Sequence, residues 1–206
     1  MSQSEYHESR WRALPIDCEP QHFALRLEFL LARVEAGQRV LDVGCAEGHF
    51  AQALTRAGAG VTGIDVAQEP LRRASRRDPK LDLRLFAPAG PWPLRDASFD
   101  VVWAGEVIEH VADTAAWLSE VRRVLVPGGL LLLSTPAHPL LARLVLALHR
   151  RSFESHFDPR GDHLRFYTAR SLRGLLEDFG FYEIQIRSGG GALGSTLLAS
   201  ARRERF

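Results

Sequence analysis

One short stretch, residues 40–50, constrains the fold of this chain more than any other. It opens with a mostly apolar run, residues 40–43, as expected for a buried parallel strand. Gly44 and Gly48 then bracket a tight turn, and apolar residues recur beyond it at helical spacing. Strand, glycine turn and helix start together place backbone amides at the carboxyl edge of a sheet. Adenosine-containing ligands commonly bind at such an edge.

Strand and helix patterns alternate along most of the chain. The strands are predicted at residues 39–43, 60–65, 81–86, 99–104, 130–134, 182–187 and 195–202. The helices between them are predicted at 47–57, 70–77, 114–125 and 169–179. This alternation indicates parallel βαβ units, whereas a glycine-rich connection between the last two strands indicates an antiparallel pair. We therefore predict an α/β fold: a Rossmann-like, doubly wound seven-stranded sheet, mostly parallel with an antiparallel last strand, and with helices on both faces.

The length of 206 residues suits one domain, residues 1–206. An N-terminal extension, residues 1–37, precedes the first strand. Its first twenty residues are polar and are expected to be irregular, and a helix is expected from Phe23 until Gly37 stops it. An insertion at about residues 136–162, with an apolar helix followed by a mixed-charge loop, is expected to cap the domain.

Composition excludes several classes of function. A formal net charge of +1 argues against a general nucleic-acid binder. Cys18 and Cys45 lie far apart without a CxxC partner, so neither a disulfide framework nor a thiolate zinc site is expected. The first residues lack the pattern of a signal peptide, and no apolar run is long enough to span a bilayer. We expect a cytoplasmic protein.

Two acidic residues narrow the choice of ligand. Asp65 ends the second predicted strand, about twenty residues beyond the glycine turn, where a carboxylate can accept both hydroxyls of a ribose. A dinucleotide site needs Gly-x-Gly-x-x-Gly, and residues 44–48 lack that spacing. Glu47 also stands where phosphate charge would collect. Together with Asp42 it suits a ligand with a cationic end, which favours an adenosyl sulfonium amino acid.

Four ordered motifs then carry a family resemblance. They read VLDVGCAEG, GIDV, SFDVVWAGEVIEHV and LVPGGLLLLSTP. In order and spacing they resemble the motifs of class I S-adenosylmethionine-dependent methyltransferases, of the ubiquinone-biosynthesis-like or type 11 branch. The resemblance covers roughly residues 38–187 and implies S-adenosyl-L-methionine as the cofactor.

The resemblance implies roles for the residues of the first two motifs. Asp42, Gly44, Cys45 and Gly48 match positions that line the methionine and ribose portions of the cofactor. Asp65 matches the carboxylate that holds the ribose hydroxyls.

The adenine and methionine ends involve further matching positions. Val66 would lie beside the adenine, and Ala104, Gly105 and Glu106 would close the pocket below the methionine moiety.

The chain departs from the family pattern at one point. Family members often carry Gly-Asp before the fourth strand, and that aspartate contacts the adenine amino group. The aligned pair here is Ala87-Pro88, so this side-chain contact is missing, and the backbone amide of Ala89 is expected to reach the ring instead.

Two histidines are candidate catalytic residues. His110 follows the fourth predicted strand and should lie near the methyl side of the cofactor, where a general base would take the acceptor's proton. The alternative for His110 is a histidine at a helix start, bonded to backbone. His163 precedes the last helix in a segment that borders the acceptor pocket in the resembling branch. The alternative for His163 is a clasp between cap and core.

The cap is the least generic part of the sequence. Its helix carries one apolar stripe, formed by Leu140, Leu141, Leu144, Val145 and Leu148. Either the stripe packs on the core as a lid, or it meets an apolar, lipid-like acceptor or, weakly, a membrane surface.

Two polar clusters are expected to hold no ligand. The first, His149, His156, Asp158 and His163, lacks the spacing of a helical metal site, so we predict no metal. The second is formed by Arg72, Arg73, Arg76 and Arg77, and it is interpreted as a solvated helix face rather than an RNA-binding patch.

The sequence thus predicts an S-adenosylmethionine-dependent methyltransferase that acts on a small-molecule acceptor, with oxygen as the acceptor atom by analogy. Two alternatives stay open: a non-catalytic module that binds S-adenosylmethionine or S-adenosylhomocysteine, and an NAD-dependent oxidoreductase. The identity of the acceptor and the oligomeric state are not predicted.

Overall fold

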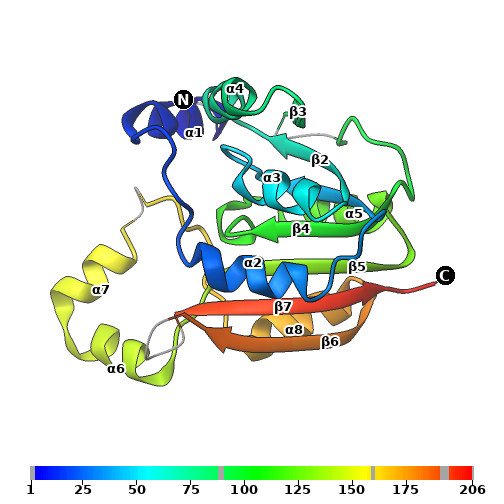
Figure 1. The fold of residues 1–206 in the computed structure, drawn as a ribbon. Coiled ribbons are helices and arrows are strands. Elements are labelled where there is room, and N and C mark those ends of the chain that lie inside the picture. Colours follow the sequence, from blue (N-terminus) through cyan, green and yellow to red (C-terminus); the bar gives the residue numbers. More distant parts are fainter. Residues whose placement is uncertain (1–2, 88–90, 159–160, 191–194, 206) are drawn as a thin grey trace.

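The chain folds around one seven-stranded sheet with the strand order β3-β2-β1-β4-β5-β7-β6 (Figure 1). The computed structural model describes residues 3–87, 91–158, 161–190 and 195–205. The strands are β1 (Arg39–Val43), β2 (Gly60–Asp65), β3 (Asp82–Leu85), β4 (Phe99–Gly105), β5 (Leu125–Pro136), β6 (Phe181–Gly189) and β7 (Thr196–Arg203).

The strand pairing confirms the predicted fold class. Strands β1 to β5 pair in parallel, and β7 is antiparallel to both β5 and β6. The strand order reverses direction between β1 and β4, which lie side by side. Ligands of open α/β sheets bind beyond the carboxyl ends of the strands at this reversal.

The helices cover both faces of the sheet. They are α1 (Gln3–Ala13), α2 (Phe23–Leu31), α3 (His49–Arg56), α4 (Gln68–Arg77), the 3-10 helix η1 (Ile108–His110), α5 (Thr114–Val124), α6 (Leu140–Leu148), α7 (Arg150–His156) and α8 (Ala169–Asp178). Helices α2 and α3 bury apolar side chains against one face, whereas α5 and α8 do so against the other. Successive residues of the central strands alternate between these two cores, as the two-residue period of a strand requires.

Several predicted helix bounds differ from the structure. The helix from Phe23 ends at Leu31, before the expected stop at Gly37. The first twenty residues were expected to be irregular, yet they contain α1. The helix after the glycine turn begins at His49 rather than residue 47, because Gly48 is its N-cap with a left-handed φ of 74°. The cap contains a second helix, α7, where a loop was expected. Thr168 caps α8 as predicted, and its hydroxyl accepts from the amide of Ser171.

Among the described residues, no helix has both the length and the apolar character needed to cross a membrane.

Candidate active site

A cavity of about 1000 Å³ lies at the carboxyl ends of β1, β2 and β4. Most of the site residues predicted from the sequence line it: Asp42, Gly44, Cys45, Asp65, Val66, Gly105, Glu106, His110 and His163. Gly48 and Ala104 do not. Gly48 shapes the turn behind the cavity, and Ala104 is fully buried in the sheet core. Ala89 lies outside the described residues.

The glycines keep the cavity floor open. Gly44 has a left-handed φ of 68°, and a Cβ built on it would lie 2.6 Å from Cγ2 of Val107. A Cβ on Gly105 would lie 2.5 Å from Cζ2 of the buried Trp103 ring. Neither position has room for a side chain, so the backbone itself forms the surface that a ligand would contact.

Two buried carboxyl groups face the cavity. Asp42 is 1% exposed, and its Oδ2 has no hydrogen-bond partner among the described residues. Burial raises the pKa of Asp42 to about 8. Asp65 accepts from the amides of Ala46 and Ala67, at 2.9 Å each, and burial raises its pKa to about 6. At neutral pH Asp42 is therefore mostly neutral, whereas Asp65 is mostly ionised.

The sequence analysis missed Arg26, the buried cation of this cavity. Its guanidinium carbon lies 4.8 Å from the centre of the Phe50 ring and 5.5 Å from that of Trp103. Arg26 donates to the carbonyl of Gln21, while its Nε has no hydrogen-bond partner among the described residues. Burial lowers the pKa of Arg26, and three nearby carboxyl groups oppose this shift: those of Glu106, Glu109 and Asp42. The unpartnered Nε of Arg26 suits a ligand carboxylate.

Glu47 is not the ligand-facing carboxylate that the sequence predicted. It is 2% exposed and does not line the cavity. One carboxylate oxygen accepts from Arg73 at 3.0 Å, and the other accepts from the amide of Asp17 at 2.8 Å. The turn, with a left-handed Ala46 (φ 51°), thus directs Glu47 towards α4.

The arginine cluster of α4 is not uniformly a solvated face, as had been predicted. Arg72 and Arg76 are exposed, but Arg73 is buried, with 8% of its surface exposed.

His110 lies at the other end of the cavity in a defined tautomer. Its Nδ1 is 2.8 Å from the carbonyl oxygen of Asp162. A carbonyl only accepts, so Nδ1 carries the proton and Nε2 carries the lone pair. Burial lowers the pKa of His110, which favours the neutral ring at neutral pH. The two alternatives for His110 therefore do not exclude each other: Nδ1 donates to backbone, and Nε2 can still accept a proton.

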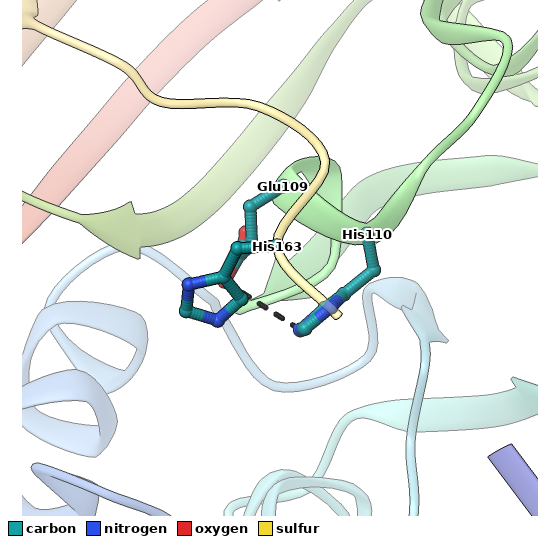
Figure 2. A group of neighbouring side chains, drawn as sticks. All are labelled: Glu109, His110 and His163. Carbon is teal, nitrogen blue, oxygen red and sulfur yellow. Dashed lines mark ion pairs between the residues drawn. The ribbon is translucent and has the colours of Figure 1, made fainter. Parts of the chain in front are cut away.

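Figure 2 shows His110 beside Glu109, both from η1, and His163 from the segment that passes over them. The ring centres of His110 and His163 are 4.9 Å apart. Glu109 is buried, and its pKa is raised to about 8, mainly by burial and next by the negative charge of the nearby Glu106. The amides of Leu164 and Arg165 both donate to the carbonyl of Glu109, which holds the His163 segment against the site.

Two groups of side chains have spacings that could hold a metal ion. Glu109, His110 and His163 bring one ligand atom each within 4.8 Å of the others. The second group is Asp17, Glu47 and His49, but Arg73 and Arg77 already pair with its carboxylates and would repel a cation. That Glu109, His110 and His163 bind no metal stays a prediction.

The cap leaves apolar side chains in solvent. Leu144 is 47% exposed and Leu148 is 85% exposed, so these members of the stripe do not pack on the core as a lid would. Phe153 and Phe157 of the α7 region are also half exposed. The side chains of Leu140, Leu141 and Val145 lie outside the described residues.

Comparison with known proteins identifies the family. A family model described as a methyltransferase domain matches residues 18–186. The chain belongs to this methyltransferase family. It is 35% identical, over 82% of its length, to a probable S-adenosylmethionine-dependent methyltransferase of Mycolicibacterium smegmatis, and it spans 63% of that protein. It is also 31% identical to a ubiquinone biosynthesis O-methyltransferase of Ralstonia nicotianae, over 86% of this chain and 78% of that protein.

A solved structure shares the fold. Phosphoethanolamine N-methyltransferase 2 of Haemonchus contortus, in complex with S-adenosyl-L-methionine, superposes with a TM-score of 0.74 over 98% of this chain and 57% of that one. Its 18% identity supports the fold alone. Family membership decides the cofactor in favour of S-adenosylmethionine and against the nicotinamide alternative.

Proposed function

We propose that this chain transfers the methyl group of S-adenosylmethionine to an oxygen of a small-molecule acceptor. The observation that carries the proposal is His110, a partly buried histidine that lines the cavity and whose Nδ1 lies 2.8 Å from the carbonyl oxygen of Asp162, so that the lone pair of the neutral ring is on Nε2. The oxygen acceptor agrees with the O-methyltransferase names of several relatives.

The cavity residues fit the two ends of the cofactor. Arg26 and Asp42 each have an unpartnered buried atom among the described residues, which suits the carboxylate and the ammonium of the methionine end. Asp65 would hold the ribose hydroxyls, and Val66 would lie beside the adenine. Gly105 belongs to the floor below the methionine, where only backbone fits.

His110 would act as the general base. S-adenosylmethionine supplies a methyl group on a positively charged sulfur, and a hydroxyl acceptor must lose its proton as its oxygen attacks that carbon. As the new C–O bond forms and the C–S bond breaks, the proton passes to Nε2 of His110. The Nδ1 bond to Asp162 fixes the ring for this transfer, and His163 stays the second candidate base.

Binding separates this proposal from a nicotinamide enzyme. Calorimetry should detect binding of S-adenosylhomocysteine and none of NAD. Binding without transfer of a labelled methyl group to any component of a metabolite extract would instead favour a non-catalytic binding module.

Cofactor binding should release a proton from Asp42. The raised pKa of about 8 leaves this carboxyl mostly protonated at pH 7, and a bound ammonium group lowers that pKa. Affinity for S-adenosylhomocysteine should therefore increase as pH rises from 6 to 8. The buffer takes up the released proton, so at pH 7 the binding enthalpy should depend on the ionisation enthalpy of the buffer. This dependence should be weaker in Asp42→Asn. Equal enthalpies in phosphate and Tris would contradict this role of Asp42.

We further propose an apolar acceptor. The exposed side chains of Leu148, Phe153 and Phe157 lie on the cap, which follows β5 beside the cavity end that holds His163. Any contact of the cap with a membrane surface would be weak, because few cations accompany these side chains. The cytoplasmic location and the absence of a nucleic-acid partner stay predictions.

A further inference from the structure

Residues 3–18 form a strap across one side of the cavity. They comprise α1 and the turn that follows it, and in Figure 1 the chain then passes the ends of the parallel strands on its way to α2. His7, Trp11, Leu14 and Cys18 all line the cavity. Helix α1 has no apolar face of its own, so contacts with the rest of the protein must hold it in place.

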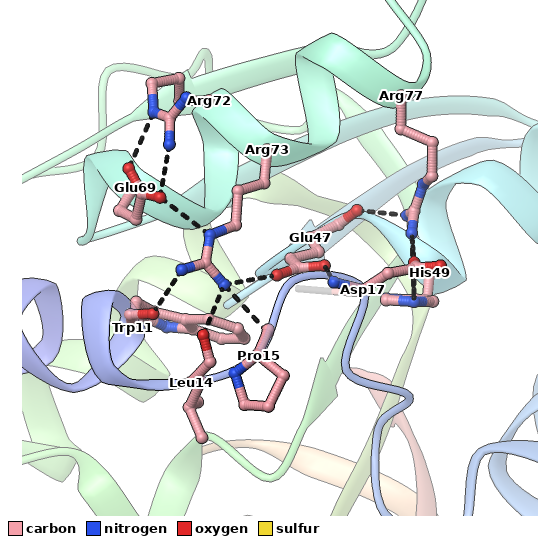
Figure 3. A network of polar contacts seen from close by, with 10 residues as sticks. All are labelled: Trp11, Leu14, Pro15, Asp17, Glu47, His49, Glu69, Arg72, Arg73 and Arg77. Atoms are coloured by element: carbon pink, nitrogen blue, oxygen red, sulfur yellow. Dashed lines mark hydrogen bonds and ion pairs between the residues drawn. The ribbon is translucent and has the colours of Figure 1, made fainter.

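Arg73 of α4 makes three of these contacts, all from a buried position. Its guanidinium donates to the carbonyls of Trp11, Leu14 and Pro15, at 2.8, 3.2 and 3.1 Å (Figure 3). These carbonyls belong to the end of α1 and the turn after it, where helix carbonyls lack internal partners. One side chain therefore fixes the end of α1.

Glu47 completes this anchor from the glycine turn. It pairs with Arg73 and also accepts from the amide of Asp17, so the strap is bound to both members of a buried ion pair. The side chains of Arg73 and Glu47 are only 6% and 2% exposed. Glu8 adds a contact at the other end of the strap, where it accepts from the first amides of α4, those of Gln68 and Glu69.

The opposite edge of the strap is held less firmly. Arg10 pairs with Asp162, next to His163, and these two side chains are 46% and 25% exposed. Exposed ion pairs contribute little stability and break readily. The strap thus has a buried anchor on α4 and a solvent-exposed contact at the acceptor end.

We propose that Arg73 is a positioning residue for the cofactor: it holds the strap closed over the cavity, so that cofactor exchange requires the strap to detach. This inference rests on the proposed placement of the cofactor in the same cavity. Arg73 itself does not line the cavity, and it acts through Trp11 and Leu14, which do.

The test compares rates of S-adenosylhomocysteine release, followed by stopped-flow tryptophan fluorescence. In Arg73→Met the dissociation rate should rise by about tenfold, because hydrogen bonds from a charged group are among the stronger ones. The KM for S-adenosylmethionine should rise while kcat stays the same or increases. Amides of residues 3–18 should also exchange hydrogen faster.

Two further variants separate this role from a loss of stability. Arg73→Met alone leaves Glu47 buried without its partner, and that lowers Tm. The double variant Arg73→Met/Glu47→Met replaces the ion pair with apolar side chains, so it should recover Tm and still release S-adenosylhomocysteine rapidly. Arg72→Met is the matched control, since Arg72 donates to Glu69, which lies on the same helix and not on the strap.

The outcomes are distinct. Wild-type release from the double variant would overturn the role of Arg73, and so would equal acceleration in Arg72→Met. If the unaltered chain binds no S-adenosylhomocysteine, the proposed function fails, and this inference fails with it.

Discussion

Replacing His110 by alanine is expected to lower kcat for methyl transfer by about 100-fold or more, the usual contribution of a general base. The variant loses the nitrogen that takes the acceptor's proton, whereas the proposed cofactor contacts are left in place. Initial rates with methyl-labelled S-adenosylmethionine measure the loss, and the affinity for S-adenosylhomocysteine should change little.

Two further measurements test whether His110 is the base: the loss of kcat in His163→Ala and the pH dependence of kcat. His163 is exposed, so its removal should cost less than removal of the partly buried His110. A base is active when neutral, and burial lowers the pKa of His110. With S-adenosylmethionine saturating, kcat of the unaltered chain should therefore hold steady around neutral pH and fall only as the pH drops into the acidic range. Full turnover by His110→Ala would exclude His110 as the base.

Replacing Arg26 by methionine is expected to raise the KM for S-adenosylmethionine by about 30-fold or more, with a smaller effect on kcat. Removing one partner of a buried charge pair typically costs about 2 kcal/mol or more, which corresponds to that change in affinity. Methionine keeps an unbranched apolar chain beside Phe50 and Trp103, so the packing of these rings should largely survive. Calorimetry compares the affinities of the unaltered chain and of Arg26→Met for S-adenosylhomocysteine, without any need for catalysis.

Arg33→Met is the matched control for this variant. Arg33 follows the end of α2, and its guanidinium carbon lies 4.2 Å from the centre of the Phe29 ring. Arg33 does not line the cavity. The Arg33→Met variant therefore loses a cation–π contact, as Arg26→Met does, but it loses no proposed contact with the ligand. Wild-type affinity in Arg26→Met, or an equal loss in Arg33→Met, would contradict the assignment of Arg26 to the cofactor carboxylate.

The central sheet could be predicted because its strands are local patterns. Strands β1 and β2 have the predicted bounds, since each is a short run of mostly apolar residues that ends in a turn or an acid. Helix α1 could not be predicted in this way. It has no apolar period, and contacts between residues distant in sequence hold it against α4: Arg73 donates to the carbonyl of Trp11, and Glu8 accepts from the amide of Gln68.

Both buried arginines have a signal in the sequence. Arg26 has helical spacing with Phe23 and Leu30, and Arg73 has it with Pro70. A charged residue on the buried face of a helix indicates a buried partner or a ligand. Arg73 was instead predicted to lie on a solvated helix face, and no role was predicted for Arg26.

The direction of Glu47 had no comparable signal. Its orientation depends on the left-handed residues Ala46 and Gly48 on either side of it. Spacing places an acid in the turn but does not fix which side of the turn it faces. For the same reason Gly48 was assigned to the pocket although it shapes the turn behind it.

The most direct test of the account follows methyl-labelled S-adenosylmethionine in an extract of apolar metabolites, with the unaltered chain and with His110→Ala. We expect label on an oxygen of one small molecule, and we expect the rate of labelling to fall by about 100-fold or more in His110→Ala although S-adenosylhomocysteine still binds. Label on nitrogen or carbon, or binding with no transfer at all, would contradict it.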